Sequence, residues 1–193
     1  MEHIVKPYHL IMGLSLLAVS TAAFSAEPVQ PQPTTPGFIL NGNTLTVATP
    51  GEVVLTFLSA SASFSSDLFL VGSPSAILNN QTAIAGTQYS LGSFAEGAEL
   101  TFNLFVNNTG FTYSTGDGSL NPDGLVHAAY AFNDNQPLTL GFEDLYLAGD
   151  SDYNDLVVSL NNVAITPVPE PETYGMLLAG LTVLGAYAKR RKS

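Results

Sequence analysis

The sequence predicts an all-β fold: a single antiparallel β-sandwich or jelly-roll-like domain. Three observations support this class. Apolar and polar residues alternate with a period of two along most of the chain, turn-forming Gly, Pro, Asn and Asp interrupt the alternation at short intervals, and no segment before the C-terminal tail has a helical period. Short strands separated by such turns are typical of sandwiches and jelly rolls.

Six stretches carry the strand pattern. In chain order they are "TLTVAT" (44–49), "EVVLTFLS" (52–59), "SDLFLVG" (66–72), and the segments 99–106, 138–142 and 156–160. Because successive side chains of a strand point to opposite faces, the alternate apolar residues of the last three predict one core-facing side for each. Turn sequences such as "TPGE", "NNTG", "GDGSLNPDG" and "FNDNQP" separate them.

The N-terminus has the pattern of a secretory signal peptide. Lys6 precedes an apolar stretch, Leu10–Phe24, and small residues follow near a cut after Ser25. We therefore expect residues 1–25 to direct export through the Sec translocase. Residues 26–37 are rich in proline and are expected to form an extended linker, and residues 38–163 are expected to form the β-sandwich domain.

The C-terminal segment, residues 164–193, differs in composition from the rest of the chain. It holds Pro169-Glu170-Pro171, an uncharged run of fifteen residues (174–188), and the basic block Lys189, Arg190, Arg191 and Lys192. As a helix the run spans about 22 Å, which is short beside a hydrocarbon core of about 30 Å. We expect a transmembrane helix with its basic end in the cytoplasm and the domain outside the inner membrane.

These parts, in this order, resemble the PEP-CTERM sorting signal of Gram-negative bacteria. The resemblance implies that an exosortase, a membrane transpeptidase, recognises Pro169-Glu170-Pro171 and removes the tail. It also implies a host that makes extracellular polysaccharide, a possible partner. The protein is then expected to be anchored transiently in the inner membrane and to end at the envelope surface or outside the cell.

Positive charge is confined to the two ends. All five Lys and Arg residues lie at position 6 or at positions 189–192, whereas only Glu2 of the sixteen Asp and Glu residues lies before Ala26. Residues 26–188 therefore carry fifteen carboxylates and no Lys or Arg. This composition excludes nucleic acid as a direct partner and disfavours anionic polysaccharide. The chain has no cysteine, so no disulfide stabilises the domain.

The thirteen residues between the strands 138–142 and 156–160 are strongly acidic. They contain the five carboxylates and one amide of a predicted metal site: Glu143, Asp144, Asp150, Asp152, Asp155 and Asn154. Two unit charges about 4 Å apart repel by about 4 kcal/mol at an effective dielectric of about 20, and a divalent cation removes this cost. Asp150, Asp152 and Asn154 have the D-x-D-x-N spacing that begins calcium loops, which predicts calcium, and either Glu143 or Asp144 is expected to close the ligand shell from the opposite strand end. The alternative is a solvated hairpin loop with Asx-turns.

A second resemblance covers roughly Val53–Leu160. "GFEDLYLAGDSDYNDLVV", "SLNPDGLVHA" and "YSLGSFAEGAELTF" resemble the signature of the domain of unknown function numbered forty-one fourteen. The resemblance implies a β-sandwich and suggests calcium at the Asp-rich motif, but it implies no established activity. Family members often have Arg where this chain has Ser151.

We therefore expect a structural or adhesive protein of the cell surface or biofilm matrix, with calcium as its cofactor. The alternative is a carbohydrate-binding module that uses exposed aromatics, for which the candidates are Tyr113, Tyr130, Tyr146 and Tyr153. We expect no enzyme, because Glu143 and Asp144 are adjacent and would point to opposite faces of a strand, which does not suit a glycosidase. Asp117, Asn121 and Asp123 are weaker ligand candidates, and His127 is expected to be structural.

Overall fold

The fold is described from a computed structural model, which describes residues 28–40, 42, 44–131, 137–166, 180, 181 and 184. The predicted signal peptide, the Pro169-Glu170-Pro171 motif, the basic block and most of the predicted transmembrane run (174–188) lie outside these ranges. Within them, no helix has the length and apolar character needed to cross a bilayer. Up to residue 166 the described helical segments are two short 3-10 turns, η1 (Gly118–Leu120) and η2 (Tyr146–Ala148).

The larger sheet has six strands, and every neighbouring pair is antiparallel. Its strands, in spatial order, are β1 (Ile39–Leu40), β10 (Ala128–Ala131), β11 (Leu138–Phe142), β12 (Leu156–Leu160), β3 (Gly51–Ser59) and β6 (Gln88–Phe94). The predicted strands 138–142 and 156–160 thus lie side by side in its centre, with Leu140 opposite Val158.

Two smaller antiparallel sheets complete the fold. The four-stranded sheet has the order β5 (Leu78–Asn79), β4 (Ser66–Leu70), β8 (Phe102–Val106) and β9 (Thr112–Ser114). The three-stranded sheet has the order β13 (Val163–Thr166), β2 (Thr44–Val47) and β7 (Glu99–Leu100). Strand β13 therefore continues to Thr166, three residues beyond the expected end of the domain.

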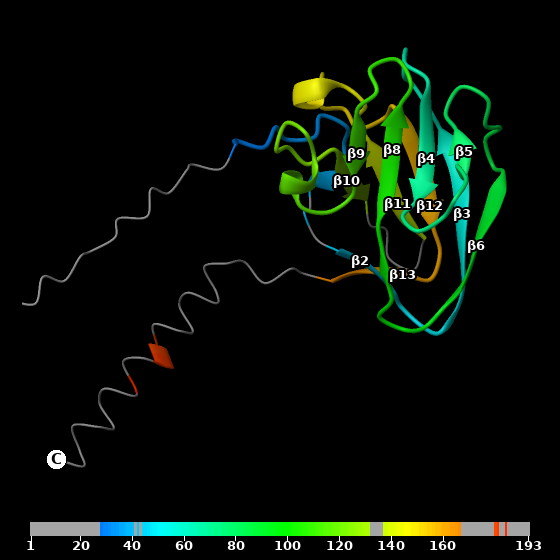
Figure 1. The fold of residues 1–193 in the computed structure, drawn as a ribbon, viewed down its shortest axis with the longest axis vertical. Coiled ribbons are helices and arrows are strands. Elements are labelled where there is room, and N and C mark those ends of the chain that lie inside the picture. Colours follow the sequence, from blue (N-terminus) through cyan, green and yellow to red (C-terminus); the bar gives the residue numbers. More distant parts are fainter. Residues whose placement is uncertain are drawn as a thin grey trace, which may run out of the picture.

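The strands form two layers around one core. In Figure 1 the strands β9, β8, β4 and β5 lie in front of β10, β11, β12 and β3. Leu68 and Leu104 from the front layer and Leu140 and Val158 from the back layer belong to the same buried cluster. The fold is therefore the predicted all-β class, an antiparallel arrangement that resembles a sandwich.

Two features of the strands differ from the simple alternating pattern. The segment 99–106 forms two strands, because β7 pairs with β2 in the small sheet while β8 pairs with β4 in the four-stranded sheet. The chain changes sheet at Thr101, whose carbonyl accepts a hydrogen bond from Val71 N. In β12, Val157 is buried as well as Val158, so both faces of this central strand are covered.

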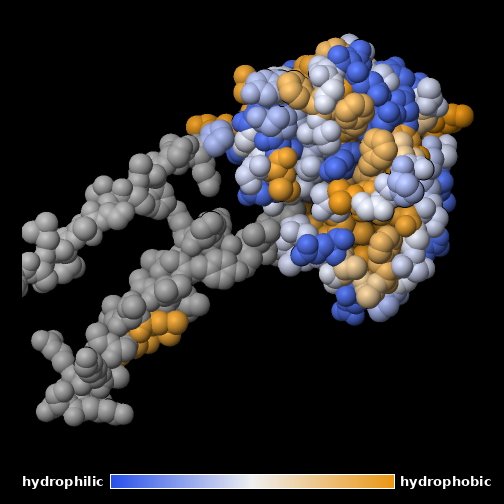
Figure 2. Space-filling view, viewed as in Figure 1, coloured by the Kyte–Doolittle hydropathy of each residue, from blue (hydrophilic) through white to orange (hydrophobic). Residues whose placement is uncertain are grey.

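Three segments that are distant in sequence meet at one end of the molecule. They are the N-terminal residues 28–38, the loop around η1, and the acidic loop around η2 (Figure 1). On the face shown in Figure 2, apolar residues are interspersed among hydrophilic ones. The acidic loop with its two neighbours is thus the part of the fold where the predicted site residues gather.

Candidate metal centre

The register of two central strands places the acidic loop. Phe142 at the end of β11 is paired with Leu156 at the start of β12, so the thirteen residues between them leave and re-enter the sheet at the same point. Glu143 comes directly after β11, and its backbone N–H donates to the carbonyl of His127 over 3.0 Å. Five carboxylates are therefore held at one end of the larger sheet.

The loop has an unusual backbone. Leu147, Ala148, Ser151 and Tyr153 all have positive φ, between 55° and 63°, although none of them is glycine. Such left-handed conformations cost of order 1 kcal/mol each for residues with a Cβ, and they persist where surrounding contacts impose them. The backbone turns so tightly that Asp150 and Asp152 face back towards Glu143.

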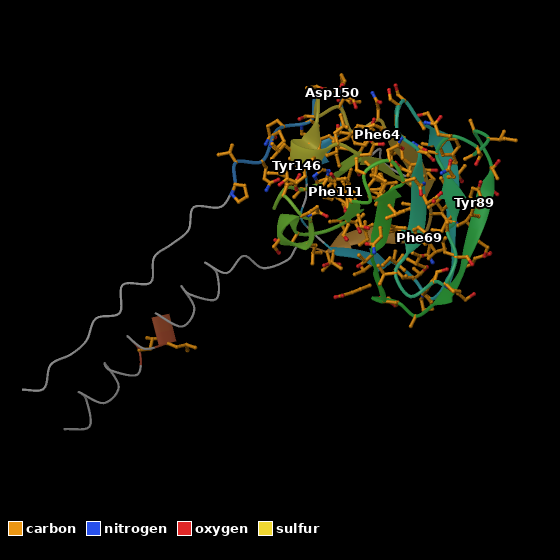
Figure 3. All side chains as sticks on the ribbon, turned by 45° about the horizontal axis from the view of Figure 1, so that its top comes forward. Phe64, Phe69, Tyr89, Phe111, Tyr146 and Asp150 are labelled. Carbon is orange, nitrogen blue, oxygen red and sulfur yellow. The ribbon has the colours of Figure 1, made fainter. Side chains whose placement is uncertain are left out.

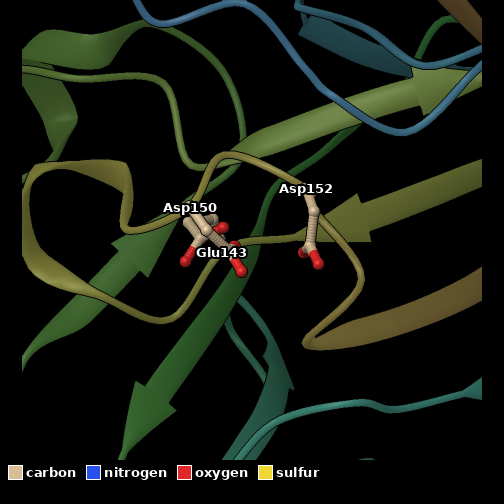
Figure 4. A group of neighbouring side chains, drawn as sticks. All are labelled: Glu143, Asp150 and Asp152. Carbon is tan, nitrogen blue, oxygen red and sulfur yellow. The ribbon is translucent and has the colours of Figure 1, made fainter.

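Glu143, Asp150 and Asp152 form the acidic cluster. One carboxylate oxygen from each of these three residues lies within 4.8 Å of the others. Figure 4 shows the side chains of Glu143 and Asp150 next to each other, with Asp152 beside them on the returning part of the loop. Asp150 is exposed, Asp152 is half-buried, and the exposed fraction of Glu143 is 0 %.

Glu143 has the least favourable environment of the three. Both of its carboxylate oxygens are buried, and no donor among the described residues reaches either of them. The side chain passes so close to Gly149 that a methyl group at this glycine would overlap Oε1. A buried acceptor without a partner costs free energy, so this carboxylate is in a position that a cation or a proton would satisfy.

The other predicted ligands are engaged elsewhere. Asp144 Oδ2 accepts from the hydroxyl of Ser66 (3.1 Å), and Asp155 Oδ2 accepts from the backbone N–H of Asp144 (2.8 Å). Asn154 donates through its backbone N–H and its Nδ2 to the two oxygens of Asp152. These contacts fix the shape of the loop around the acidic cluster.

The electrostatics follow from burial without cationic neighbours. Burial, followed by the negative charge of Asp155 and the hydrogen bond that a protonated Glu143 donates to it, and then by the charges of Asp150 and Asp152, raises the pKa of Glu143 to about 8. Burial also raises the pKa of Asp155 to about 6 and raises the pKa of Asp144 above its ordinary value. Ionisation of these buried carboxyl groups is therefore less favourable than in water. This is expected for a cluster whose negative charge a metal ion would balance.

The N-terminal segment binds to the acidic loop. Both the backbone N–H and the hydroxyl of Thr34 donate to the carbonyl of Ser151, and the hydroxyl of Thr35 donates to the carbonyl of Asp152 (2.6 Å). Gln30 makes two further hydrogen bonds, to Gly124 O and from Val126 N. The described part of the segment expected to be a linker thus holds the loop in place. No motif in the sequence predicts these contacts.

The weaker ligand candidates serve the architecture. Asp117 caps η1, and Asn121 bonds Ser114 N and Leu125 O. The imidazole of His127 is completely buried, with Nδ1 2.8 Å from Glu143 O and Nε2 2.9 Å from Asp123 Oδ2. Both ring nitrogens therefore have an oxygen partner, and these two contacts fix the orientation of the ring.

Three of the four tyrosines proposed for sugar binding are in the core. Tyr113, Tyr130 and Tyr153 are fully buried and cannot contact a glycan, so the prediction was wrong for them. Alternation in a strand does not reveal which aromatic residues the second layer covers. Tyr146 is different: it lies on η2 and is 49 % exposed.

Two family models match the chain. The PEP-CTERM protein-sorting motif matches residues 167–192. The chain is therefore a PEP-CTERM protein, a class whose motif indicates export and membrane-anchored processing by an exosortase. Its core matches the domain of unknown function DUF4114 over residues 68–162, which include the whole acidic loop, so it is a PEP-CTERM protein with a DUF4114 core. Neither a curated protein nor a solved structure matches the chain significantly.

Proposed function

We propose that this exported, exosortase-sorted protein binds a calcium ion at the acidic cluster and acts as a structural or adhesive component of the cell surface or extracellular matrix. Glu143, Asp150 and Asp152 would hold the ion. The ion would offset their mutual repulsion and keep the loop between β11 and β12 in its folded shape. The proposal assigns the domain no catalytic step.

The buried carboxylate of Glu143 carries the proposal. A solvated acidic loop does not require a fully buried glutamate, whereas Glu143 has no exposed surface and no donor from the described residues within reach. Two further carboxylates lie within 4.8 Å of it. A cation between them would supply the missing partner of Glu143 and would balance the negative charge of all three.

The donor set favours calcium over zinc. The clustered donors are all carboxylate oxygens, which suit hard cations, and calcium accepts irregular sets of six to eight oxygen ligands. Zinc sites use His or Cys, but the chain has no Cys, and both nitrogens of His127 already have oxygen partners. The remaining calcium ligands would be main-chain carbonyls or water.

Thermal melts test the calcium part of the proposal. We expect millimolar calcium to raise Tm by several degrees above the value in chelator, because the ion binds the native state alone. Asp150→Asn and Asp152→Asn should lose this rise, whereas Asp117→Asn, a matched change in the η1 turn, should keep it. A wild-type Tm that does not respond to calcium would rule the ion out.

A genetic experiment tests the structural or adhesive part. Deleting the gene should weaken aggregation or surface adhesion of the exporting cells, and the wild-type gene should restore it. The Asp152→Asn gene should not restore it if calcium holds the active form. Full restoration by this variant would separate adhesion from calcium, and no defect on deletion would contradict the structural role itself.

A further inference from the structure

The acidic loop also contributes one ring of an exposed aromatic pair. Tyr146 of η2 stacks on Phe111, with ring centroids 5.4 Å apart and an interplanar angle of 29°. The exposed fractions are 49 % for Tyr146 and 37 % for Phe111. Figure 3 shows both rings at the end of the molecule that carries Asp150, away from Phe69 and Tyr89. We call these two rings the aromatic platform.

The aromatic platform is supported by buried rings. Phe111 also contacts Tyr113 (centroids 6.3 Å apart), and Tyr113 stacks on the imidazole of His127 at 3.7 Å. Tyr113 and His127 are both fully buried. The exposed rings therefore rest on a column of packed rings that leads into the core, so binding a ligand would cost little ordering of side chains.

Shared hydrogen bonds connect the platform to the acidic cluster. The imidazole of His127, which ends the column, contacts the carbonyl of Glu143 through Nδ1 and Asp123 Oδ2 through Nε2. Asp123 Oδ2 also accepts a hydrogen bond from the backbone N–H of Leu147, the residue after Tyr146. The loop from Glu143 to Asp150 thus carries both the tyrosine and two of the clustered carboxylates. An ion held by the cluster and the face of Tyr146 would be presented on one surface.

Charge selects the class of ligand. The exported part of the chain has fifteen carboxylates and no Lys or Arg, so anionic polymers and a second copy of the chain are repelled. A neutral sugar is not repelled. Its C–H face can lie against an aromatic ring, and its hydroxyl oxygens are of the type that calcium coordinates.

We propose that the aromatic platform, together with the acidic cluster, is a binding site for neutral polysaccharide, with Tyr146 stacking on a hexose ring and calcium coordinating hydroxyl oxygens of the same polysaccharide chain. Phe111 supports the tyrosine from below. The calcium contact rests on the proposed function, whereas the aromatic contact rests on the stacking and exposure of the two rings.

The test is a pull-down of the full-length chain, purified in mild detergent, with insoluble neutral polysaccharides: cellulose, β-1,3-glucan, mannan and starch. Calcium alginate beads serve as the anionic comparator, and phosphatidylglycerol vesicles serve as the lipid comparator. We expect the chain to bind at least one neutral polysaccharide in the presence of calcium. In chelator this binding should weaken by about tenfold or more.

Variants assign the binding to the platform. Tyr146→Ala should weaken binding by about tenfold or more, because it removes the exposed ring, and Tyr146→Phe should retain most of it. Ile84→Ala changes an exposed apolar residue of another loop and should have no effect. The calcium-induced rise in Tm should persist in Tyr146→Ala, which shows that the variant is folded and loaded.

The outcomes separate the two proposals. A calcium-dependent Tm without binding to any neutral polysaccharide overturns the sugar site and leaves the calcium site standing. Binding only to alginate or only to vesicles also overturns it, as does binding that Tyr146→Ala leaves unchanged. Neutral-sugar binding that needs Tyr146 but ignores calcium supports the platform and contradicts the contact with the ion.

Discussion

At the scale of single residues, Glu143 combines the features that define the candidate site. Its side chain is fully buried, its oxygens have no donor among the described residues, and Gly149 leaves the space that Oε1 occupies. The sequence predicted that either Glu143 or Asp144 closes the ligand shell, but it could not decide between these two residues. Ranking depends on which carboxylates already have donors, such as Ser66 beside Asp144, and Ser66 is 78 positions away in the chain.

Glu143→Gln tests this residue directly. The amide has nearly the same shape but cannot ionise. Because the raised pKa of Glu143, about 8, keeps the wild-type carboxyl protonated at neutral pH, the metal-free variant should match the wild type there and be more stable only above pH 8, where the wild type acquires a buried charge. The calcium-induced rise in Tm should disappear. Glu96→Gln, at an exposed position, is the control and should change neither quantity. Retention of the calcium response by Glu143→Gln would remove this residue from the site.

The raised pKa of Glu143, about 8, sets a pH dependence. Between the ordinary glutamate value and pH 8 the native state holds a proton that the unfolded chain has lost, so stability falls as pH rises through this window. Asp155, with its pKa raised to about 6, adds a further loss of stability as the pH rises. In chelator, Tm should therefore be lower at pH 8 than at pH 5.5.

Calcium should reverse this trend, because the ion binds the deprotonated carboxylate and its affinity increases with pH. Melts at several pH values, with and without calcium, measure both effects. Glu143→Gln serves as the control and should have a flatter Tm profile in chelator. A metal-free Tm that stays constant or rises from pH 5.5 to pH 8 would contradict the assigned environment.

At the scale of elements, the strands around the site follow from the sequence, but the loop conformation does not. Period-two alternation predicted the bounds of β11 and β12, and their antiparallel pairing brings the ends of the loop together. Local pattern does not predict left-handed backbone at Leu147 or Tyr153, since those residue types disfavour it. The hydrogen bonds of Thr34 and Thr35 to the acidic loop could not be predicted from local sequence either, because their partners, Ser151 and Asp152, lie 117 positions away.

Gly141 in β11 shows how closely the loop packs on the sheet. A methyl group there would overlap the carbonyl oxygen of Tyr153 and the ring of Phe38. Gly141→Ala should therefore destabilise the domain by about 1–3 kcal/mol, the usual cost of overpacking, as measured by chemical denaturation. Gly42→Ala is the matched control, because the nearest atom to its methyl group is 3.5 Å away. Equal stabilities of the two variants would contradict the packing described here.

At the scale of the whole molecule, one chain combines a C-terminal sorting motif with an acidic two-layer domain. The all-β class could be predicted because alternation and turns are local signals. The sequence could not predict which aromatic residues are buried. Tyr113 and Tyr146 differ in exposure because of contacts between layers and loops, which are not local signals. The negative charge of the domain could also be predicted from the sequence, because every Lys and Arg lies outside residues 26–188.

Deleting Pro169–Pro171 tests the sorting motif in the exporting host. Because the motif lies within the matched segment 167–192, its loss should block removal of the tail. A C-terminal epitope tag should then remain on the protein, as immunoblotting of cell fractions would show. Glu172→Ala changes the acid just after the motif and should be processed normally. Normal processing of the deletion would overturn the role of Pro-Glu-Pro.

The most direct measurement for the central claim is an anomalous difference map from crystals of the exported domain grown with calcium. We expect a peak about 2.3–2.6 Å from carboxylate oxygens of Glu143, Asp150 and Asp152. Such a peak would place the ion at the buried carboxylate that lacks a donor. Ordered water in its place, or a calcium peak only at another site, would contradict the account and leave the acidic loop as a solvated hairpin.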